Sequence, residues 1–141
     1  NDLFNKQRER WRISIIPTNG ALRRCLEALK ENKLVALVAD RDFTQSGVEM
    51  DFLAKKTLIP KGAAVFSAKT GAPIIPTFFL RNADDSFTME FGELIYPPAV
   101  QEDVITEELL YTIMQKYTAV IEEKIRQYPT QWLMFREFWI K

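Results

Sequence analysis

Four charged side chains lie close together where an apolar run of the sequence ends. Residues 34–39 are all apolar, and Asp40, Arg41 and Asp42 follow directly, with Glu49 a few positions later. In open α/β sheets, ligands bind outside the carboxyl ends of the strands, because the loops there can vary without disturbing the core. An arginine at this position can bind an anion, and the carboxylates can hold Mg²⁺. The same residues also fit a solvated loop whose charges pair only for structural reasons.

Two more residues are candidates for anion binding. Arg8 lies in the basic N-terminal stretch, where it is either a donor to a phosphate or a charge on a helix surface. Gly62 lies near the start of a predicted helix, where it either admits a phosphate to the backbone N–H groups or lets the helix pack closely. Glu49 alternates with Val48 and Met50, which places its carboxylate on the polar face of a strand.

Composition narrows the classes of function. The chain has 141 residues, enough for one domain, of which 47% are hydrophobic and 27% charged, as in a folded globular protein. The 19 basic and 19 acidic residues cancel, so we expect no nucleic-acid partner. The single Cys25 excludes an internal disulfide and is predicted to be a small core residue. The sequence contains no histidine, the commonest general base, and no apolar run as long as a membrane span of about 18 residues.

The hydrophobic patterns predict one layered α/β domain, a mixed β-sheet flanked by helices, with elements in the order α-β-α-β-α-β-β-α. The strand at 33–40 is apolar on both faces and is therefore predicted to be buried and central. Asn19 and Gly71 suit a helix N-cap and a helix C-cap, and the turn at 82–85 predicts a hairpin. The predicted helices cover residues 3–12, 20–32, 60–70 and 106–127, and the predicted strands cover residues 13–17, 33–40, 73–81 and 86–95.

A series of short motifs occurs in a specific order along nearly the whole chain. It comprises "NDLFNKQRERW" with Arg8, the Asp-Arg-Asp group at 40–42, "GVEMDF" at 47–52, "PKGAA" at 60–64, "TGAPIIP" at 70–76 and "YPTQWLMFREFW" at 128–139. Each motif is weak alone, but the ordered series resembles the bacterial lipid A biosynthesis acyltransferases and the related phosphatidylinositol mannoside acyltransferases, in the lysophospholipid acyltransferase superfamily. The family's His-x-x-x-x-Asp/Glu motif is absent, and Leu53-Ala54 replaces its usual Phe-Gly. The chain is therefore expected to be the C-terminal part of such an enzyme, to lack the N-terminal half of a glycerolphosphate-acyltransferase-like fold, and to be inactive alone.

The resemblance implies transfer of a fatty acyl chain from acyl carrier protein or acyl-coenzyme A to a hydroxyl group of a glycolipid, either a lipid A precursor or a mannosylated lipid. It implies no cofactor, and peripheral contact with the cytoplasmic face of the bacterial inner membrane, either directly or through an N-terminal anchor. By resemblance, Glu49 would be an accessory carboxylate near the catalytic histidine. The residues implied in substrate binding are Arg8, Asp40, Arg41, Asp42 and Gly62.

Two other readings of the residues remain open. The first is a non-catalytic α/β module that binds phosphate, lipid or a partner chain, and the second is a Mg²⁺-dependent phosphoryl enzyme that uses Asp40 and Asp42. An incomplete fold would also make the isolated chain dimerise or aggregate, because an apolar central strand needs neighbours on both edges. The aromatic segment at 128–139 suits either a bilayer interface or docking on the core.

Overall fold

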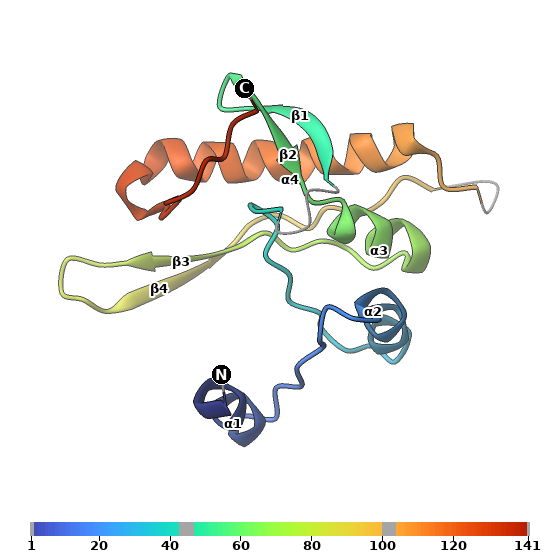
Figure 1. Ribbon diagram of the computed structural model, residues 1–141, viewed down its shortest axis with the longest axis horizontal. Coiled ribbons are helices and arrows are strands. Elements are labelled where there is room, and N and C mark those ends of the chain that lie inside the picture. Colours follow the sequence, from blue (N-terminus) through green and yellow to red (C-terminus); the bar gives the residue numbers. More distant parts are fainter. Residues whose placement is uncertain (1, 43–46, 100–103, 141) are drawn as a thin grey trace. The chain divides into compact units, whose positions relative to one another are not determined.

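The computed structural model describes residues 2–42, 47–99 and 104–140, which form two compact units (Figure 1). The first unit, Asn1–Val35, contains α1 (Asp2–Arg10) and α2 (Ala21–Lys30). The second unit, Ala36–Lys141, contains the described strands and the other described helices. These are β1 (Val48–Phe52), β2 (Lys55–Ile59), α3 (Gly62–Thr70), β3 (Thr77–Arg81), β4 (Phe87–Phe91), α4 (Glu107–Gln127) and the short 3-10 helix η1 (Pro129–Gln131). The α/β class is confirmed, whereas the single domain stays a prediction.

Within the first unit, α2 begins differently from the expectation. Its N-cap is Gly20, with a left-handed backbone (φ 73°) and no capping side chain, so the assignment of Asn19 as the cap is wrong. Cys25 is buried, as predicted, and burial raises the pKa of its thiol. Leu22, by contrast, is exposed and does not belong to a buried stripe. Residues 13–17 form no strand, because no described segment pairs with them.

In the second unit, β1 and β2 form an antiparallel hairpin with Val48 opposite Ile59 and Phe52 opposite Lys55. The two turn residues, Leu53 and Ala54, both have positive φ (50° and 64°), as in the tight turns that suit the twist of paired strands. The prediction missed β2, whose residues lie outside the helices and strands expected from the sequence. Its two lysines are both exposed, and Leu58 is half-buried between the buried Thr57 and Ile59, so no full alternation marks the strand.

The core of the second unit lies between the β1–β2 hairpin, α3 and α4 (Figure 1). Thr106 caps α4 by accepting a hydrogen bond from Leu109 N at 3.1 Å, which satisfies one of the free donors of the first turn. Gly71 ends α3 in the left-handed conformation (φ 73°), as predicted. The core side chains are Met50, Phe52, Ile59, Ala64, Ile95, Leu110, Ile113, Met114 and Tyr117. No helix of the described residues is long and apolar enough to cross a membrane.

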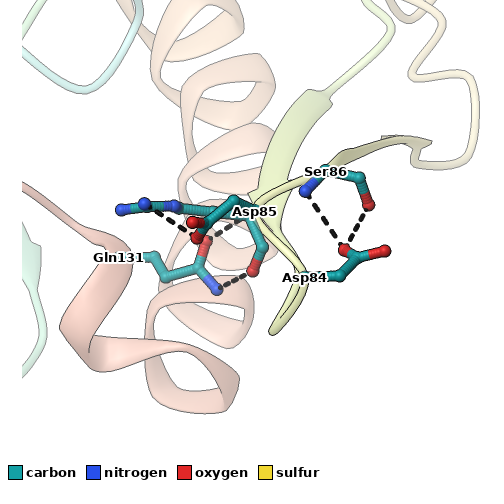
Figure 2. Close-up of polar contacts among 5 residues, drawn as sticks. Asp84, Asp85, Ser86 and Gln131 are labelled. Atoms are coloured by element: carbon teal, nitrogen blue, oxygen red, sulfur yellow. Dashed lines mark hydrogen bonds and ion pairs between the residues drawn. The ribbon is translucent and has the colours of Figure 1, made fainter.

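Strands β3 and β4 form the predicted hairpin, with Phe79 opposite Met89. One face contacts the end of α4, where Lys124 Nζ donates to Glu90 Oε2 at 2.7 Å. At the other end of the hairpin, Asp84 Oδ1 accepts hydrogen bonds from both the backbone and the side chain of Ser86 (Figure 2). The outer face is exposed and carries Phe79, Phe87, Met89 and Phe91.

The strand expected at residues 33–40 does not form. Leu34 is 93% exposed and Val38 is 65% exposed, and the described sheets contain only β1–β2 and β3–β4. A strand exists only through hydrogen bonds to a neighbour, and no described segment pairs with these residues. The prediction of a buried central strand is therefore wrong for this chain as the structure describes it.

Candidate functional site

Asp40 and Arg41 are held by two consecutive residues of the C-terminal segment. Trp132 Nε1 donates a hydrogen bond to Asp40 Oδ2 at 3.1 Å, and Arg41 Nη2 donates to Leu133 O at 2.9 Å. Arg41 Nε lies 3.9 Å from the same Asp40 oxygen, which is an ion pair but too long for a hydrogen bond. The side chains of Arg41 and Asp40 are 35% and 25% exposed, so this pair is neither buried nor freely solvated.

The end of the charged stretch is hydrogen-bonded to the residue that precedes β1. Asp42 Oδ2 accepts a hydrogen bond from Gly47 N at 2.5 Å. A side chain at position 47 has no room, because a Cβ there would lie 2.6 Å from Ile59 O and 2.8 Å from Asp42 Oδ2. Gly47 is thus required by the close approach of two backbones and one carboxylate. The loop predicted between these residues, at 43–46, lies outside the described residues.

Glu49 is exposed on β1, opposite Leu58, while Met50 and Phe52 point into the core. The alternation predicted for this strand is therefore present. Gly62 is the first residue of α3, and a Cβ there would meet only Phe66 Cε2, at 3.9 Å. That is an ordinary contact, so close packing does not explain the glycine. No hydrogen bond or ion pair within the described part of the second unit joins Glu49 or Gly62 to the Asp40–Arg41 pair.

Arg8 lies in the last turn of α1, in the first unit, and its side chain is exposed. Its backbone carbonyl ends the helix by accepting hydrogen bonds from Trp11 N at 3.0 Å and Ile13 N at 2.9 Å. The guanidinium can therefore act as a surface donor, and the position fits both readings given to it above.

The C-terminal strap, residues 132–140, docks on the β1–β2 hairpin. The rings of Trp132, Phe138 and Trp139 surround Phe52 at centroid distances of 6.0, 5.6 and 6.5 Å. Ile140 N donates to Lys56 O at 2.9 Å, and Thr57 Oγ1 donates to Phe138 O. Three of the four aromatic residues of the strap therefore serve the core rather than a bilayer, and only Phe135 is largely exposed, at 86%.

Trp132 and Leu133 are the site residues that the sequence analysis missed. Each is separated from its partner, Asp40 or Arg41, by 92 positions in the chain, and no local pattern reports a contact of that kind. The magnesium reading finds no support in the ranges described, where no group of three or more His, Cys, Asp or Glu side chains converges.

Comparison with known proteins identifies the class of protein. The chain belongs to the bacterial lipid A biosynthesis acyltransferase family, whose profile matches residues 1–141. It is 28% identical to a phosphatidylinositol mannoside acyltransferase of Mycolicibacterium smegmatis and 29% identical to one of Mycobacterium tuberculosis. Both alignments cover 97% of this chain, but only 43% and 42% of the respective relatives. The chain thus spans about two fifths of the length of the curated relatives it matches.

Proposed function

We propose that this chain is part of a membrane-associated acyltransferase that moves a fatty acyl chain from an acyl thioester to a hydroxyl group of a glycolipid. The observation that carries the proposal is the family match over the whole chain. The mycobacterial relatives, whose names state transfer to a phosphatidylinositol mannoside, favour a mannosylated lipid over a lipid A precursor as the acceptor. The donor would be acyl carrier protein or acyl-coenzyme A, and the enzyme would work at the cytoplasmic face of the inner membrane.

In this proposal the chain supplies substrate-binding groups and not the base. The sequence has no histidine, so a histidine base would come from outside these 141 residues. Arg41 is the best-placed anion donor, because its guanidinium is partly exposed and fixed by the strap. Glu49, exposed on β1, would be the accessory carboxylate that approaches the base. The remaining residues proposed for the substrate site are Arg8, Asp40, Asp42 and Gly62, of which Asp40 would act beside Arg41 and not on the anion itself.

A non-catalytic module that binds phosphate, lipid or a partner chain is the second candidate. One specific observation favours it, namely the absence of histidine from the sequence. The exposed hydrophobic residues of the 33–39 stretch, with no strand beside them in the described structure, also fit a chain that completes its fold by association. Association of the isolated chain therefore remains a prediction, to be checked by sedimentation.

The test of the enzyme proposal uses the complete reading frame that encodes this chain. Acyl transfer to a mannosylated phosphatidylinositol is measured for the wild type and for Arg41→Ala, with Arg81→Ala as the matched control. Arg81 also makes an ion pair, with Asp85 at 2.8 Å, but this pair lies at the exposed hairpin turn. We expect Arg41→Ala to lower kcat/KM about tenfold or more, since a lost hydrogen bond to a charged group costs about 1.5–3 kcal/mol.

Three results would count against this assignment. Unchanged kcat/KM in Arg41→Ala would remove Arg41 from the site. Equal losses in both arginine variants would indicate a general effect on folding. Robust turnover by the 141-residue chain itself would refute its predicted inactivity, because loss of a general base typically lowers the rate by about 10²–10⁴.

A further inference from the structure

The indole N–H of Trp132 lies against the carboxylate that neighbours the proposed anion-binding arginine. We propose that Trp132 is a positioning residue: by engaging Asp40 Oδ2, it keeps that carboxylate from closing on Arg41 and so leaves the guanidinium available to a phosphate group. The inference rests on the proposed function of Arg41 and adds an account of how its guanidinium stays available to a phosphate group.

The geometry around Asp40 Oδ2 carries the argument. This oxygen accepts from Trp132 Nε1 at 3.1 Å and lies 3.9 Å from Arg41 Nε. Arg41 Nε is itself buried and makes no hydrogen bond to any residue that the structure describes. A fully formed carboxylate–guanidinium pair has N–O distances of about 2.7–2.9 Å and often two parallel hydrogen bonds. Here the indole holds the oxygen about 1 Å farther away, which leaves the ion pair incomplete.

The arginine is also fixed from its other side. Arg41 Nη2 donates to Leu133 O at 2.9 Å, and Leu133 directly follows Trp132 in the chain. Only one of the five N–H donors of the guanidinium is engaged by this hydrogen bond. The group is therefore oriented by the strap. Because Nε is buried while the side chain is 35% exposed, the donors left for a phosphate oxygen are those of the terminal nitrogens.

Trp132 can position Asp40 because its own ring is immobilised by contacts on two sides. The side chain of the preceding residue, Gln131, makes two hydrogen bonds to the backbone of the last residue of β3. Its Oε1 accepts from Arg81 N at 2.8 Å and its Nε2 donates to Arg81 O at 3.1 Å (Figure 2). The Trp132 ring packs on Phe52 at 6.0 Å and on Phe138 at 5.2 Å, the latter edge to face. The direction of the indole N–H is thus set before any ligand binds.

The experiment measures the binding of inorganic phosphate to the 141-residue chain by NMR, following the Arg41 Nε–Hε signal and the backbone amides around it. Trp132→Phe keeps an aromatic ring but removes the N–H. Trp139→Phe is the matched control, because Trp139 belongs to the same strap and packs on Phe52 at 6.5 Å, yet donates no indole hydrogen bond within the described structure. Arg41→Lys removes the forked donor itself.

We expect phosphate to bind the wild type saturably. The dissociation constant should be about 3–10-fold higher in Trp132→Phe, because the lost indole N–H frees Asp40 Oδ2 to approach Arg41, and within about twofold of wild type in Trp139→Phe. Arg41→Lys should lose most of the binding. An unchanged dissociation constant in Trp132→Phe, with binding lost in Arg41→Lys, overturns the positioning role but leaves the anion site standing. Wild-type affinity in Arg41→Lys, or no binding by the wild type, overturns the site and this inference together.

A second variant keeps the inference testable if Trp132→Phe does not fold. Asp40→Asn retains an oxygen for the indole but removes the charge that competes for Arg41. If Trp132 serves to restrain Asp40, phosphate should bind this variant at least as tightly as it binds the wild type. Weaker binding to Asp40→Asn would overturn the inference, because it would mean that the carboxylate supports the arginine rather than competing with the anion.

Discussion

Replacing Gly47 by alanine tests how closely the chain at this position packs against Ile59 of β2 and against Asp42. The added Cβ would lie 2.6 Å from Ile59 O, 2.9 Å from Ile59 C and 2.8 Å from Asp42 Oδ2. Ile59 cannot retreat, since its side chain is fully buried in the core and its backbone pairs with Val48. The chain around position 47 must therefore move, and the 2.5 Å hydrogen bond from Gly47 N to Asp42 must lengthen or break.

The magnitude follows from three effects. Overpacking a tight position costs about 1–3 kcal/mol. Loss of the Asp42 hydrogen bond adds about 0.5–1.5 kcal/mol. Alanine restricts the unfolded chain and returns about 0.4–1 kcal/mol. We therefore expect Gly47→Ala to lower the free energy of unfolding by about 0.5–4 kcal/mol.

Gly62→Ala is the matched control, because it makes the same chemical change where there is room. The new Cβ would meet only Phe66 Cε2, at the ordinary distance of 3.9 Å, and the residue is the first of α3. Alanine restricts the unfolded chain and favours the helix, so this variant should be as stable as the wild type or up to about 1 kcal/mol more stable.

Urea unfolding is the assay, followed by tryptophan fluorescence, because Trp132 and Trp139 pack against Phe52 in the same unit. The free energies come from linear extrapolation with equal slopes for the three proteins. A Gly47→Ala variant within 0.5 kcal/mol of the wild type would refute the argument from close approach, as would a Gly62→Ala variant that is the less stable of the two.

Two further predictions concern contacts to α4. Tyr117 donates its hydroxyl to Pro60 O at 2.8 Å, so Tyr117→Phe should lower the free energy of unfolding by about 1–2 kcal/mol. Burial raises the pKa of Tyr117 above its usual 10, so the stability that this group contributes is complete below pH 10 and is lost as the pH rises further. Thermal unfolding should therefore show a smaller alkaline loss of stability in Tyr117→Phe than in the wild type. Equal losses in the two proteins would contradict this. The pKa of Lys124 is also raised, chiefly by its 2.7 Å hydrogen bond to Glu90. A double-mutant cycle with Lys124→Met and Glu90→Gln should give a coupling free energy of about 0.5–1 kcal/mol. A coupling of zero would show that this pair does not stabilise the contact between the hairpin and α4.

The parts of the fold that local sequence signals determine agree with prediction. Helix α4 combines a capping threonine, acidic residues in its first turn and apolar residues at helical spacing, and it forms from Glu107 to Gln127. Gly71 ends α3 because the left-handed conformation at that position suits glycine best. The β3–β4 hairpin forms where two runs rich in aromatic residues flank a polar turn. Each of these signals acts over a few residues and needs no distant partner.

The parts that depend on a partner could not be read in the same way. The run at 33–39 has the composition of a central strand, but strand formation requires hydrogen bonds from a neighbour, and no described segment provides them. Strand β2 shows the converse. Lys55 and Lys56 suggest a loop, yet pairing with β1 and docking of the strap at Thr57 make these residues part of a strand. In both segments tertiary pairing, and not local propensity, decides the structure.

The candidate site follows the same logic. The composition of residues 40–42 is enough to suggest an anion site, but it cannot show whether the neighbouring carboxylate occupies the hydrogen-bond donors of Arg41. That depends on Trp132, 92 positions away from Asp40, which is itself placed by Gln131 and Phe52. The closing "YPTQW" motif and the charged stretch, two separate motifs in the sequence, are therefore one structural unit. Substitution of an uncharged strap residue should accordingly affect anion binding, and Trp132→Phe beside Trp139→Phe isolates that effect from packing.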